Sequence, residues 1–362
     1  MSKNIKILAY YLPQFHPIPE NDKWWGKDFT EWTNVKKAQP LFNGHKQPVI
    51  PGELGYYDLL KQPEIQKKQA DLAKKYGIDG FIYYQYWFGN GKMLLEKPAE
   101  QMLKDKSVTL PFCFCWANET WKGIWHGMDN PNTLIEQIYS GKEDYTNYFN
   151  YLLPFFNDDR YIKIDNKPVF IIYDAMVLDN DFINFFQDLA IKNKFEGLHF
   201  MVSNRGNNTI DYKAKGFQSK ITGDYNVLLD KELEKARHYT VLDRILLRFN
   251  LGRKQPISLG YKKFFAKLNY TNSNLETFPM VVPNWDNTPR SKLKGFLFSN
   301  SSPKLFKTEL IKAKNFLLKQ NNINNIIVIK SWNEWAEGNY LEPDNANSTN
   351  WLEKVNELKN EF

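Results

Sequence analysis

Two glutamates, Glu334 and Glu337, lie three positions apart near the end of the sequence, beside the indoles of Trp332 and Trp335. Paired carboxyl groups can divide the work of a general acid and a general base, and carboxylates accept hydrogen bonds from sugar hydroxyls. Indoles offer flat apolar faces on which the C–H side of a sugar ring can stack. The alternative is a surface loop with ordinary glutamates and two packed indoles. The density of these residue types favours chemistry on a carbohydrate.

The β-branched run 326–329, directly before this segment, is typical of a strand buried on both faces. In a barrel of parallel strands, chemistry takes place where such strands end. A glycosidase needs one carboxyl group protonated and the other ionised, and an apolar setting raises a carboxyl pKa while hydrogen-bond donors lower it. The spacing does not distinguish the standard two-carboxylate mechanism from substrate-assisted ones.

The composition excludes several protein classes. Aromatic residues make up 16% of the 362 residues, with 11 Trp and 20 Tyr, which excludes low-aromatic disordered chains and coiled coils. The same excess favours a wide aromatic-lined cleft. The length suits one large α/β barrel or two smaller domains. A net charge of +7 permits an anionic substrate or membrane contact but requires neither.

Two features concern the compartment. Cys113 and Cys115 would point to one face of a strand, which suits neither an ordinary disulfide nor a zinc site, so we interpret them as small buried residues. The first residues lack the apolar segment and cleavage site of a signal peptide, and no run reaches the ~18 apolar residues of a membrane span. We expect a cytoplasmic protein, and peripheral association with the inner face of the membrane is a further hypothesis.

Strand-like and helix-like segments alternate along the chain, which predicts βα units and a parallel sheet. About eight units in this length predict a (β/α)8 TIM barrel with long βα loops, and residues 1–362 would form one catalytic domain. The alternative is an open doubly wound sheet, but no glycine-rich nucleotide-binding motif follows any strand. The predicted strands are 5–13, 80–88, 110–116, 168–173, 198–202, 217–225, 278–282 and 326–329. The predicted helices are 63–76, 94–104, 142–156, 181–193 and 303–319.

Polar and aromatic side chains gather after successive predicted strands, which as a set favours a glycan cleft on one face of the barrel. Any one of them could equally be a packing residue. The long loop 14–62 is expected to cover that face. A lone His there is more often structural than a ligand, and without a paired-His motif we predict no metal and no cofactor. The candidate sugar ligands are Tyr86, Trp87, Asn118, Glu119, Trp121, Tyr173, Asp286, Arg290, Trp332, Asn333 and Trp335, and the loop candidates are His16, Glu31 and Trp32.

Residues 231–270 interrupt this pattern with ten Lys or Arg against three acidic residues. A solvated insertion helix is the ordinary interpretation of such a segment. A sharper hypothesis is weak contact with an anionic membrane or a lipid-linked glycan. The basic residues form one insertion and not a stripe among the Trp positions, so nucleic-acid binding is not expected. The apolar residues that would share one helical face are Val241, Leu242, Ile245, Leu246 and Phe249.

Six motifs together resemble the WbsX-type family, whose members are often labelled glycosyltransferases of surface-polysaccharide biosynthesis. A more distant similarity, strongest at 332–338, connects the chain to family 99 glycoside hydrolases, the endo-α-mannosidases. The motifs are Tyr-Tyr-Leu-Pro-Gln-Phe-His-Pro-Ile-Pro-Glu-Asn-Asp (10–22), Phe-Thr-Glu-Trp-Thr-Asn-Val (29–35), Tyr-Gly-Ile-Asp-Gly-Phe (76–81), Cys-Trp-Ala-Asn-Glu (115–119), Trp-Asp-Asn-Thr-Pro-Arg (285–290) and Trp-Asn-Glu-Trp-Ala-Glu-Gly (332–338).

The resemblance to the hydrolases implies a (β/α)8 barrel and retaining chemistry on an α-mannoside. It implies that Glu334 removes the proton of the sugar's own 2-hydroxyl, which gives a 1,2-anhydro intermediate. It further implies that Glu337 protonates the leaving oxygen and later activates water. The chain departs from the hydrolases at Ala336, where they commonly carry His. That difference leaves the leaving-group side and the acceptor open.

We therefore expect a carbohydrate-active enzyme of the family 99-like type that hydrolyses an α-linked glycan in surface-polysaccharide or lipopolysaccharide metabolism. The alternative is a glycosyltransferase of O-antigen or capsule biosynthesis. Such an enzyme should need an activated donor, whose phosphates Arg205, Arg290 or the 231–270 segment could bind. A second alternative is a non-catalytic barrel that binds a glycan.

Overall fold

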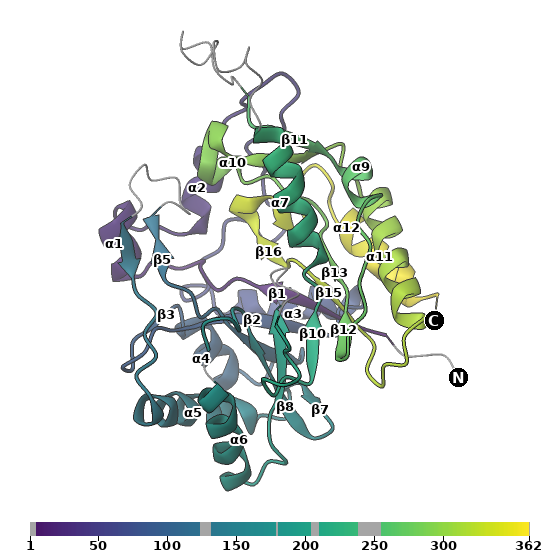
Figure 1. Cartoon of the computed structure of the whole chain (residues 1–362). Coiled ribbons are helices and arrows are strands. Elements are labelled where there is room, and N and C mark those ends of the chain that lie inside the picture. The colour runs from purple at the N-terminus through teal and green to yellow at the C-terminus, as the bar shows by residue number, and fades with distance from the viewer. Residues whose placement is uncertain (1–4, 124–131, 179, 204–209, 238–254, 362) are drawn as a thin grey trace.

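A sheet of parallel strands forms the centre of the molecule (Figure 1). The computed structural model describes residues 5–123, 132–178, 180–203, 210–237 and 255–361. Within these residues the main strands lie in the order β12-β10-β9-β8-β4-β2-β1-β15-β13. Their bounds are β1 (Lys6–Tyr11), β2 (Gly80–Trp87), β4 (Phe112–Trp116), β8 (Lys167–Ile172), β9 (His199–Ser203), β10 (Ser219–Ile221), β12 (Glu276–Phe278), β13 (Met280–Val281) and β15 (Ile326–Ile329).

The two edges of this sheet meet at Pro279. Strand β12 pairs with β10 at one edge and β13 pairs with β15 at the other, and Pro279 alone separates β12 from β13. Proline cannot donate a ladder hydrogen bond, so the strand is interrupted there, while the Pro279 carbonyl accepts from the Val328 amide at 3.0 Å. Counted as one interrupted strand, β12 and β13 complete a nearly closed, eight-stranded TIM-barrel-like fold. The predicted fold class is confirmed.

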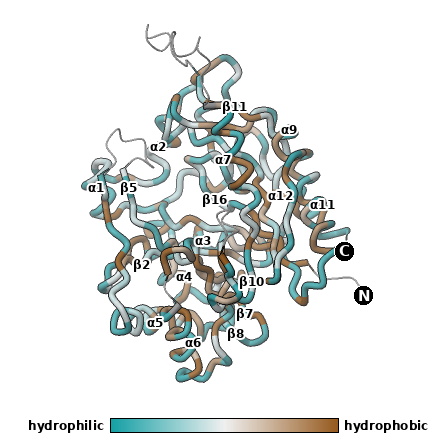
Figure 2. The backbone as a smooth tube through the Cα atoms, in the orientation of Figure 1, coloured by the Kyte–Doolittle hydropathy of each residue, from teal (hydrophilic) through white to brown (hydrophobic). Residues whose placement is uncertain are grey.

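Helices follow the barrel strands and pack around them (Figure 1). Figure 2 shows apolar residues concentrated in the strands and in helix segments beside them, as expected for strands covered on both faces. The helices are α1 (Pro19–Trp25), α2 (Glu31–Lys37), α3 (Glu64–Lys75), α4 (Lys97–Lys104), α5 (Lys142–Phe156), α6 (Asn180–Lys192), α7 (Asp224–Arg237), α9 (Tyr261–Phe265), α10 (Thr288–Ser291), η2 (Lys292–Lys294), α11 (Pro303–Leu318), η3 (Trp335–Glu337) and α12 (Asn350–Lys359). The minor strands are β3 (Met93–Leu94), β5 (Trp121–Lys122), β6 (Thr133–Ile135), β7 (Lys163–Ile164), β11 (Ile257–Gly260), β14 (Phe296–Ser299), β16 (Asn333–Glu334) and β17 (Asn339–Tyr340).

Two expectations about single segments were wrong. Residues 14–62 are not one plain loop, because they form α1 with Pro19 at its first position and α2 with a capping box between Thr30 and Thr33. The sixth strand does not extend over 217–225. It is limited to β10, because helix α7 already begins at Asp224.

The basic segment 231–270 is only partly described. Its first residues belong to α7, which begins before position 231, and β11 pairs in parallel with β14. Residues 238–254 lie outside the described residues, and with them the expected apolar helical face and the cations Arg244, Arg248, Arg253 and Lys254. In the part of the chain that the structure describes, none of the helices has the length and apolarity needed to cross a bilayer.

Alternate residues of β2 point to opposite sides of the barrel wall, as strand geometry requires. Tyr84 faces the interior and stacks on Tyr10 of β1, with ring centroids 5.0 Å apart. Tyr86 lies on the same side as Tyr84. Trp87 points outward and stacks on Tyr148 of α5 at 4.7 Å. The interior face of β2 therefore supplies tyrosines to the barrel, and the outer face anchors a helix.

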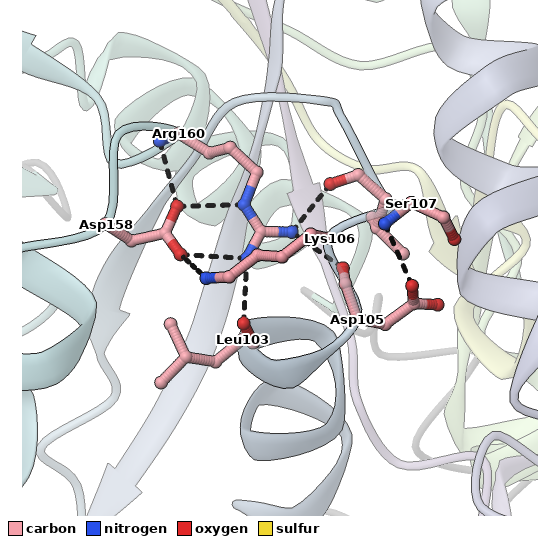
Figure 3. A network of polar contacts seen from close by, with 7 residues as sticks. Leu103, Asp105, Lys106, Ser107, Asp158 and Arg160 are labelled. Atoms are coloured by element: carbon pink, nitrogen blue, oxygen red, sulfur yellow. Dashed lines mark hydrogen bonds and ion pairs between the residues drawn. The ribbon is translucent and has the colours of Figure 1, made fainter.

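The amino end of the barrel is held by Arg160 (Figure 3). Its guanidinium donates to the backbone carbonyls of Leu103, Asp105 and Val108 at 2.7–3.0 Å and to the Asp158 carboxylate at 2.8 and 2.9 Å. These bonds connect the end of α4 to the segment between α5 and β7. Hydrogen bonds from Arg160, opposed by burial, hold the pKa of Asp158 well below its usual range.

Candidate active site

Strand β15 leads directly into the turn that carries both glutamates. Strand β16 pairs antiparallel with β17, and η3 forms one short turn between them. Gly338 ends this turn with φ +60°, and a Cβ there would lie 2.8 Å from the backbone nitrogen of Asp286. The Asp286 amide donates to the carbonyl of Glu337 at 2.6 Å. Glycine at 338 therefore lets the turn lie against the 286 backbone, which fixes the backbone of Glu337.

Arg290 of α10 lies between two carboxylates. Its Nη1 donates to Glu337 Oε1 at 2.6 Å, and its Nη2 donates to Oε1 of Glu31, the first residue of α2. Glu31 is fully buried, and the Arg290 side chain is 12% exposed. Burial raises the pKa of Glu31, and the Arg290 charge opposes that rise. The predicted loop residue Glu31 and the predicted strand-end residue Arg290 thus meet in one cluster with Glu337.

Glu334 is buried and lies within hydrogen-bonding reach of Glu337. Burial raises the pKa of Glu334 to about 8, Lys330 opposes the shift, and Glu337 adds to it. The two carboxyl groups are therefore unequal: Glu337 contacts a guanidinium, and Glu334 contacts Glu337. Two carboxyl groups whose surroundings favour different protonation states can serve as an acid and a base.

A cavity of about 130 Å³ lies at the carboxyl end of the barrel strands. Tyr84 and Tyr173 in its wall are both close enough to Glu334 for that carboxylate to raise their pKa, although burial is the larger cause. Aromatic faces and hydrogen-bonding groups in one small cavity suit a sugar ring. The lining residues are Tyr10, Tyr84, Tyr173, Ser203, Asn226, Asp230, Met280 and Lys330.

The indoles of the motif have no open face. Trp332 is 0% exposed and Trp335 is 2% exposed. Trp335 stacks on Tyr340 at 3.9 Å, and its Nε1 donates to Glu342 at 2.6 Å. Stacking against a sugar, which we expected of these indoles, requires a face that this packing covers. Their observed contacts instead fix the turn that carries Glu334 and Glu337.

Three of the predicted sugar ligands are used to hold backbone segments. Asn333 donates to the carbonyl of Leu12 and accepts from its amide. Asn118 does the same with Asp174. Asp286 accepts from the Gln47 amide at 2.7 Å and also bonds to His45 and to the Thr288 hydroxyl that begins α10. Asp286 therefore positions the helix that carries Arg290.

The remaining candidates divide between the mouth and the outside of the barrel. Tyr86 packs edge-on against Trp121 at 5.2 Å, and Glu334 is the largest influence after burial in raising its pKa. Trp87 lies on the outer face and donates to Asp144 of α5, so it does not reach the mouth. Glu119 is half-buried on the segment after β4.

The loop candidates behave differently from one another. Glu31 joins the cluster. Trp32 packs against Trp335, with ring centroids 5.3 Å apart, and donates to the carbonyl of Tyr57. It therefore helps to hold the turn that carries Glu334 and Glu337. His16 is 1% exposed, and burial lowers its pKa.

Several residues of the site were not anticipated from the sequence. Two of them, Lys330 and Tyr84, could have been found from the sequence. Tyr84 lies on a predicted strand two positions from Tyr86, and so on the same face, and Lys330 directly follows another predicted strand. Glu342 accepts hydrogen bonds from Trp335, Tyr57 and Gln69, and burial raises its pKa to about 7. No local pattern predicts the contacts with Tyr57 and Gln69, because these partners lie 285 and 273 positions from Glu342.

The family model for Glycosyltransferase WbsX matches residues 7–355. The chain belongs to the WbsX glycosyltransferase family. It is 34% identical over 361 residues to the WxcX protein of Xanthomonas campestris pv. campestris, an alignment that covers 96% of this chain and 48% of WxcX. The chain thus spans about half the length of the curated relatives that it matches.

Comparison with solved structures gives separate evidence for the fold of this WbsX family member. The GH99 endo-alpha-mannosidase from Bacteroides thetaiotaomicron, in complex with Bis-Tris-Propane, superposes with a TM-score of 0.59 at 15% identity, over 99% of this chain and 98% of that one. A glycoside hydrolase-like protein gives 0.60 at 14% identity, over 98% and 94%. At these identities the likeness establishes a GH99-like barrel fold. The comparisons thus give the family of the chain and its fold.

Proposed function

We propose that this chain transfers a glycosyl unit from an α-linked, mannose-configured glycoside to a sugar hydroxyl, with retention and through Glu334 and Glu337. The observation that carries the proposal is the buried pair of unequal carboxyl groups next to a cavity lined by tyrosines. Transfer to a sugar is favoured over transfer to water by the family to which the chain belongs. We further propose a role in surface-polysaccharide metabolism, which the resemblance of the motifs to the WbsX-type family implies.

The charge of the site favours a glycosidic donor over a nucleotide sugar. Among the described residues of the cluster, Glu31, Glu334 and Glu337 face two cations, Arg290 and Lys330. Arg290 is already bound to two carboxylates. A diphosphate donor would bring two further negative charges next to these groups, and like charges at such distances repel strongly. A neutral glycosidic bond avoids that repulsion.

In the proposed reaction the two glutamates move protons and leave the bond changes to the sugar. The bond between C1 and the leaving oxygen breaks with its electron pair on that oxygen, which takes a proton from one glutamate. The 2-hydroxyl oxygen attacks C1 and gives its proton to the other. The acceptor hydroxyl then opens this 1,2-anhydro ring at C1 and gives its proton to the first glutamate. The 2-oxygen takes its proton back from the second glutamate. Such substrate-assisted sequences are an exception to the ordinary two-carboxylate mechanism.

The test uses the purified chain with a panel of α-linked manno-oligosaccharides, a labelled sugar acceptor, and GDP-mannose in a parallel reaction. We expect the labelled acceptor to gain a hexose from the oligosaccharide donor. NMR of the product should show that the new bond keeps the α configuration. Glu334→Gln and Glu337→Gln should abolish transfer, and Glu143→Gln, an exposed glutamate on α5, should not. Glycan binding without turnover in the wild type would support the non-catalytic alternative.

Hydrolysis is the second candidate, and the GH99-like barrel is the observation that favours it. It uses the same two glutamates, with water in place of the acceptor hydroxyl. The two candidates separate in one reaction mixture. Free reducing sugar that forms at the same rate with and without acceptor supports hydrolysis, while strict dependence on GDP-mannose would contradict both candidates, since each uses a glycosidic donor.

A further inference from the structure

The guanidinium of Arg290 cannot serve both glutamates of the pair equally. Nη1 is bonded to Glu337 and Nη2 to Glu31, so the two ends of the guanidinium are directed at different carboxylates. Within the described residues no ion pair joins Arg290 to Glu334. Charge-assisted bonds from a planar guanidinium are directional, so the partner that receives one is stabilised as an anion far more than its neighbour.

Glu31 explains why Arg290 stays in this position. Glu31 is 0% exposed on α2 and no other cation bonds to it among the described residues. A buried carboxylate without a partner is costly, so Arg290 cannot turn away from Glu31 without a large loss of free energy. The Asp286 contacts fix α10 from the other side. Arg290 is therefore a fixed charge beside Glu337 and not a mobile one.

We propose that Arg290, held by Glu31, keeps Glu337 as the anion of the pair and leaves the proton on Glu334 before a substrate binds. Two carboxyl groups in hydrogen-bonding contact hold one proton between them, and the nearer cation decides which of them gives it up. This proposal rests on the proposed function. It places the resting proton opposite to the roles that the resemblance to the hydrolases implies, in which Glu334 would be the base.

Other groups around Glu334 do not reverse this assignment. Lys330, which directly follows β15, favours an ionised Glu334, but no ion pair within 4.0 Å joins them, and its Nζ lies 5.2 Å from the ring centre of Trp285. Tyr84, Tyr86 and Tyr173 face Glu334 as neutral phenols, because burial raises the pKa of each.

Glu337 is faced by two tyrosines besides Arg290, Glu31 and Glu334. They are Tyr173 and Tyr225 of α7, and burial raises the pKa of both. Neutral phenols do not compete with a guanidinium in direct contact with the carboxylate. Of the contacts among the described residues, the bond to Arg290 is the one that distinguishes Glu337 from Glu334.

The test reads the proton on the unliganded full chain, labelled with 13C at the glutamate carboxyl carbons and followed by NMR from pH 4 to pH 9. We expect one carboxyl signal that titrates above neutral pH and disappears in Glu334→Gln. Glu309 and Glu342 also have a pKa raised to about 7, so Glu309→Gln and Glu342→Gln assign their signals. If the high-pH signal survives Glu334→Gln and is lost in Glu337→Gln, the assignment is overturned.

A double variant, Arg290→Gln with Glu31→Gln, tests the role of the arginine. It removes the cation together with its fully buried counter-ion Glu31, and Glu337, whose side chain is 19% exposed, can take up the proton when it loses Arg290. We expect the proton to move toward Glu337, so that the Glu337 signal gains part of the titration step above neutral pH that the wild type shows at Glu334 alone. A step that stays confined to Glu334 in the folded double variant would overturn the role of Arg290. Because no substrate is needed, failure here is distinct from failure of the proposed transfer.

Discussion

Two equally buried arginines lie at opposite ends of the barrel and are bonded in opposite ways. Arg160 and Arg290 each have a side chain that is 12% exposed. Arg160 meets one acid, Asp158, and three backbone carbonyls, so that each of its three nitrogens donates. Arg290 meets two acids, Glu31 and Glu337, and its Nε has no hydrogen-bond partner among the described residues.

The difference fits a structural site at the amino end and the proposed chemical site at the carboxyl end. Buried polar atoms in proteins are nearly always paired, and each unpaired one costs free energy. The amino end of a barrel is where stability is built, and there every nitrogen of the Arg160 guanidinium has a partner. The carboxyl end is where TIM-barrel enzymes carry out their reactions, and there one guanidinium bonds to two acids and leaves one donor unused. The unused Arg290 donor supports the proposal that a ligand binds at the carboxyl end.

The largest expected effect is on activity, from variants at the carboxyl end. Glu334→Gln and Glu337→Gln should each lower the rate of glycosyl transfer by about 10³-fold, because acid–base catalysis by a positioned group contributes on that order. Transfer kinetics with the manno-oligosaccharide that proves active in the donor panel measure this loss, and circular dichroism confirms folding. If either variant retains activity within a few-fold of the wild type, that glutamate is not part of the chemistry.

A variant at the amino end should show the reverse profile. Arg160→Met removes one of the two cations that bond to the buried Asp158, leaving only Lys106, and it leaves three carbonyls without a donor, so we expect a loss of about 3 kcal/mol of stability. Urea unfolding measures it. The rate per folded molecule should stay unchanged at a temperature where the variant is folded. Arg160→Lys is the matched control, since it keeps the charge but cannot reach all the carbonyls, and it should lose less.

The turn at Gly338 joins the chemical end to the rest of the barrel, and a third variant measures how tightly. Gly338→Ala combines a strained φ of +60° with a collision against the Asp286 backbone. Gly55 has a φ of +63°, and no atom lies within 4 Å of the position that a Cβ would take there, so Gly55→Ala carries the strain alone. We expect losses of about 2 and about 1 kcal/mol respectively in urea unfolding. Equal losses would mean that the contact with Asp286 contributes nothing.

Much of the barrel was predictable because its strands are continuous apolar or aromatic runs. Residues 326–329 and 80–88 are such runs, and both became buried strands. The three-residue β10 has no such run, since it is Ser-Lys-Ile, and its length was overestimated. The short helices α1 and α2 were missed. Their start signals, a proline and a capping box, lie in a segment rich in tryptophan that we interpreted as one loop.

The chemical end was less predictable, for identifiable reasons. Trp87 was grouped with Tyr86, although successive strand residues face opposite sides, so that strand periodicity alone separates them. The burial of Trp335 depends on Tyr340 and Trp32, which no local pattern reveals. The bond between His45 and Asp286 joins residues 241 positions apart. Such contacts are set by tertiary packing and enter only with the fold.

The smallest expected effect is a difference in how the two ends respond to pH. Hydrogen bonds from Arg160 lower the pKa of Asp158, so its contribution to stability is present above the ordinary Asp pKa and is lost as pH falls below it. Burial raises the pKa of Glu334 to about 8. Between pH ~4.3 and about pH 8 the folded state therefore binds more protons than the unfolded state. The stability of the folded state relative to the unfolded state falls over this range, and the contribution of protonated Glu334 is lost once pH has risen through about 8.

Urea unfolding of the wild type, Glu334→Gln and Asp158→Asn between pH 3 and pH 9 compares the two ends directly. Glu334→Gln should gain on the wild type as pH rises from pH 5 to pH 9, because the amide has no proton to lose. Asp158→Asn should be less stable than the wild type at pH 7, and the gap should narrow below pH ~4. Glu309 and Glu342 are present in all three proteins, so their titration cancels. A constant gap between the wild type and Glu334→Gln would show that Glu334 titrates like an exposed glutamate, and the two ends of the barrel would then not differ in the way their arginines indicate.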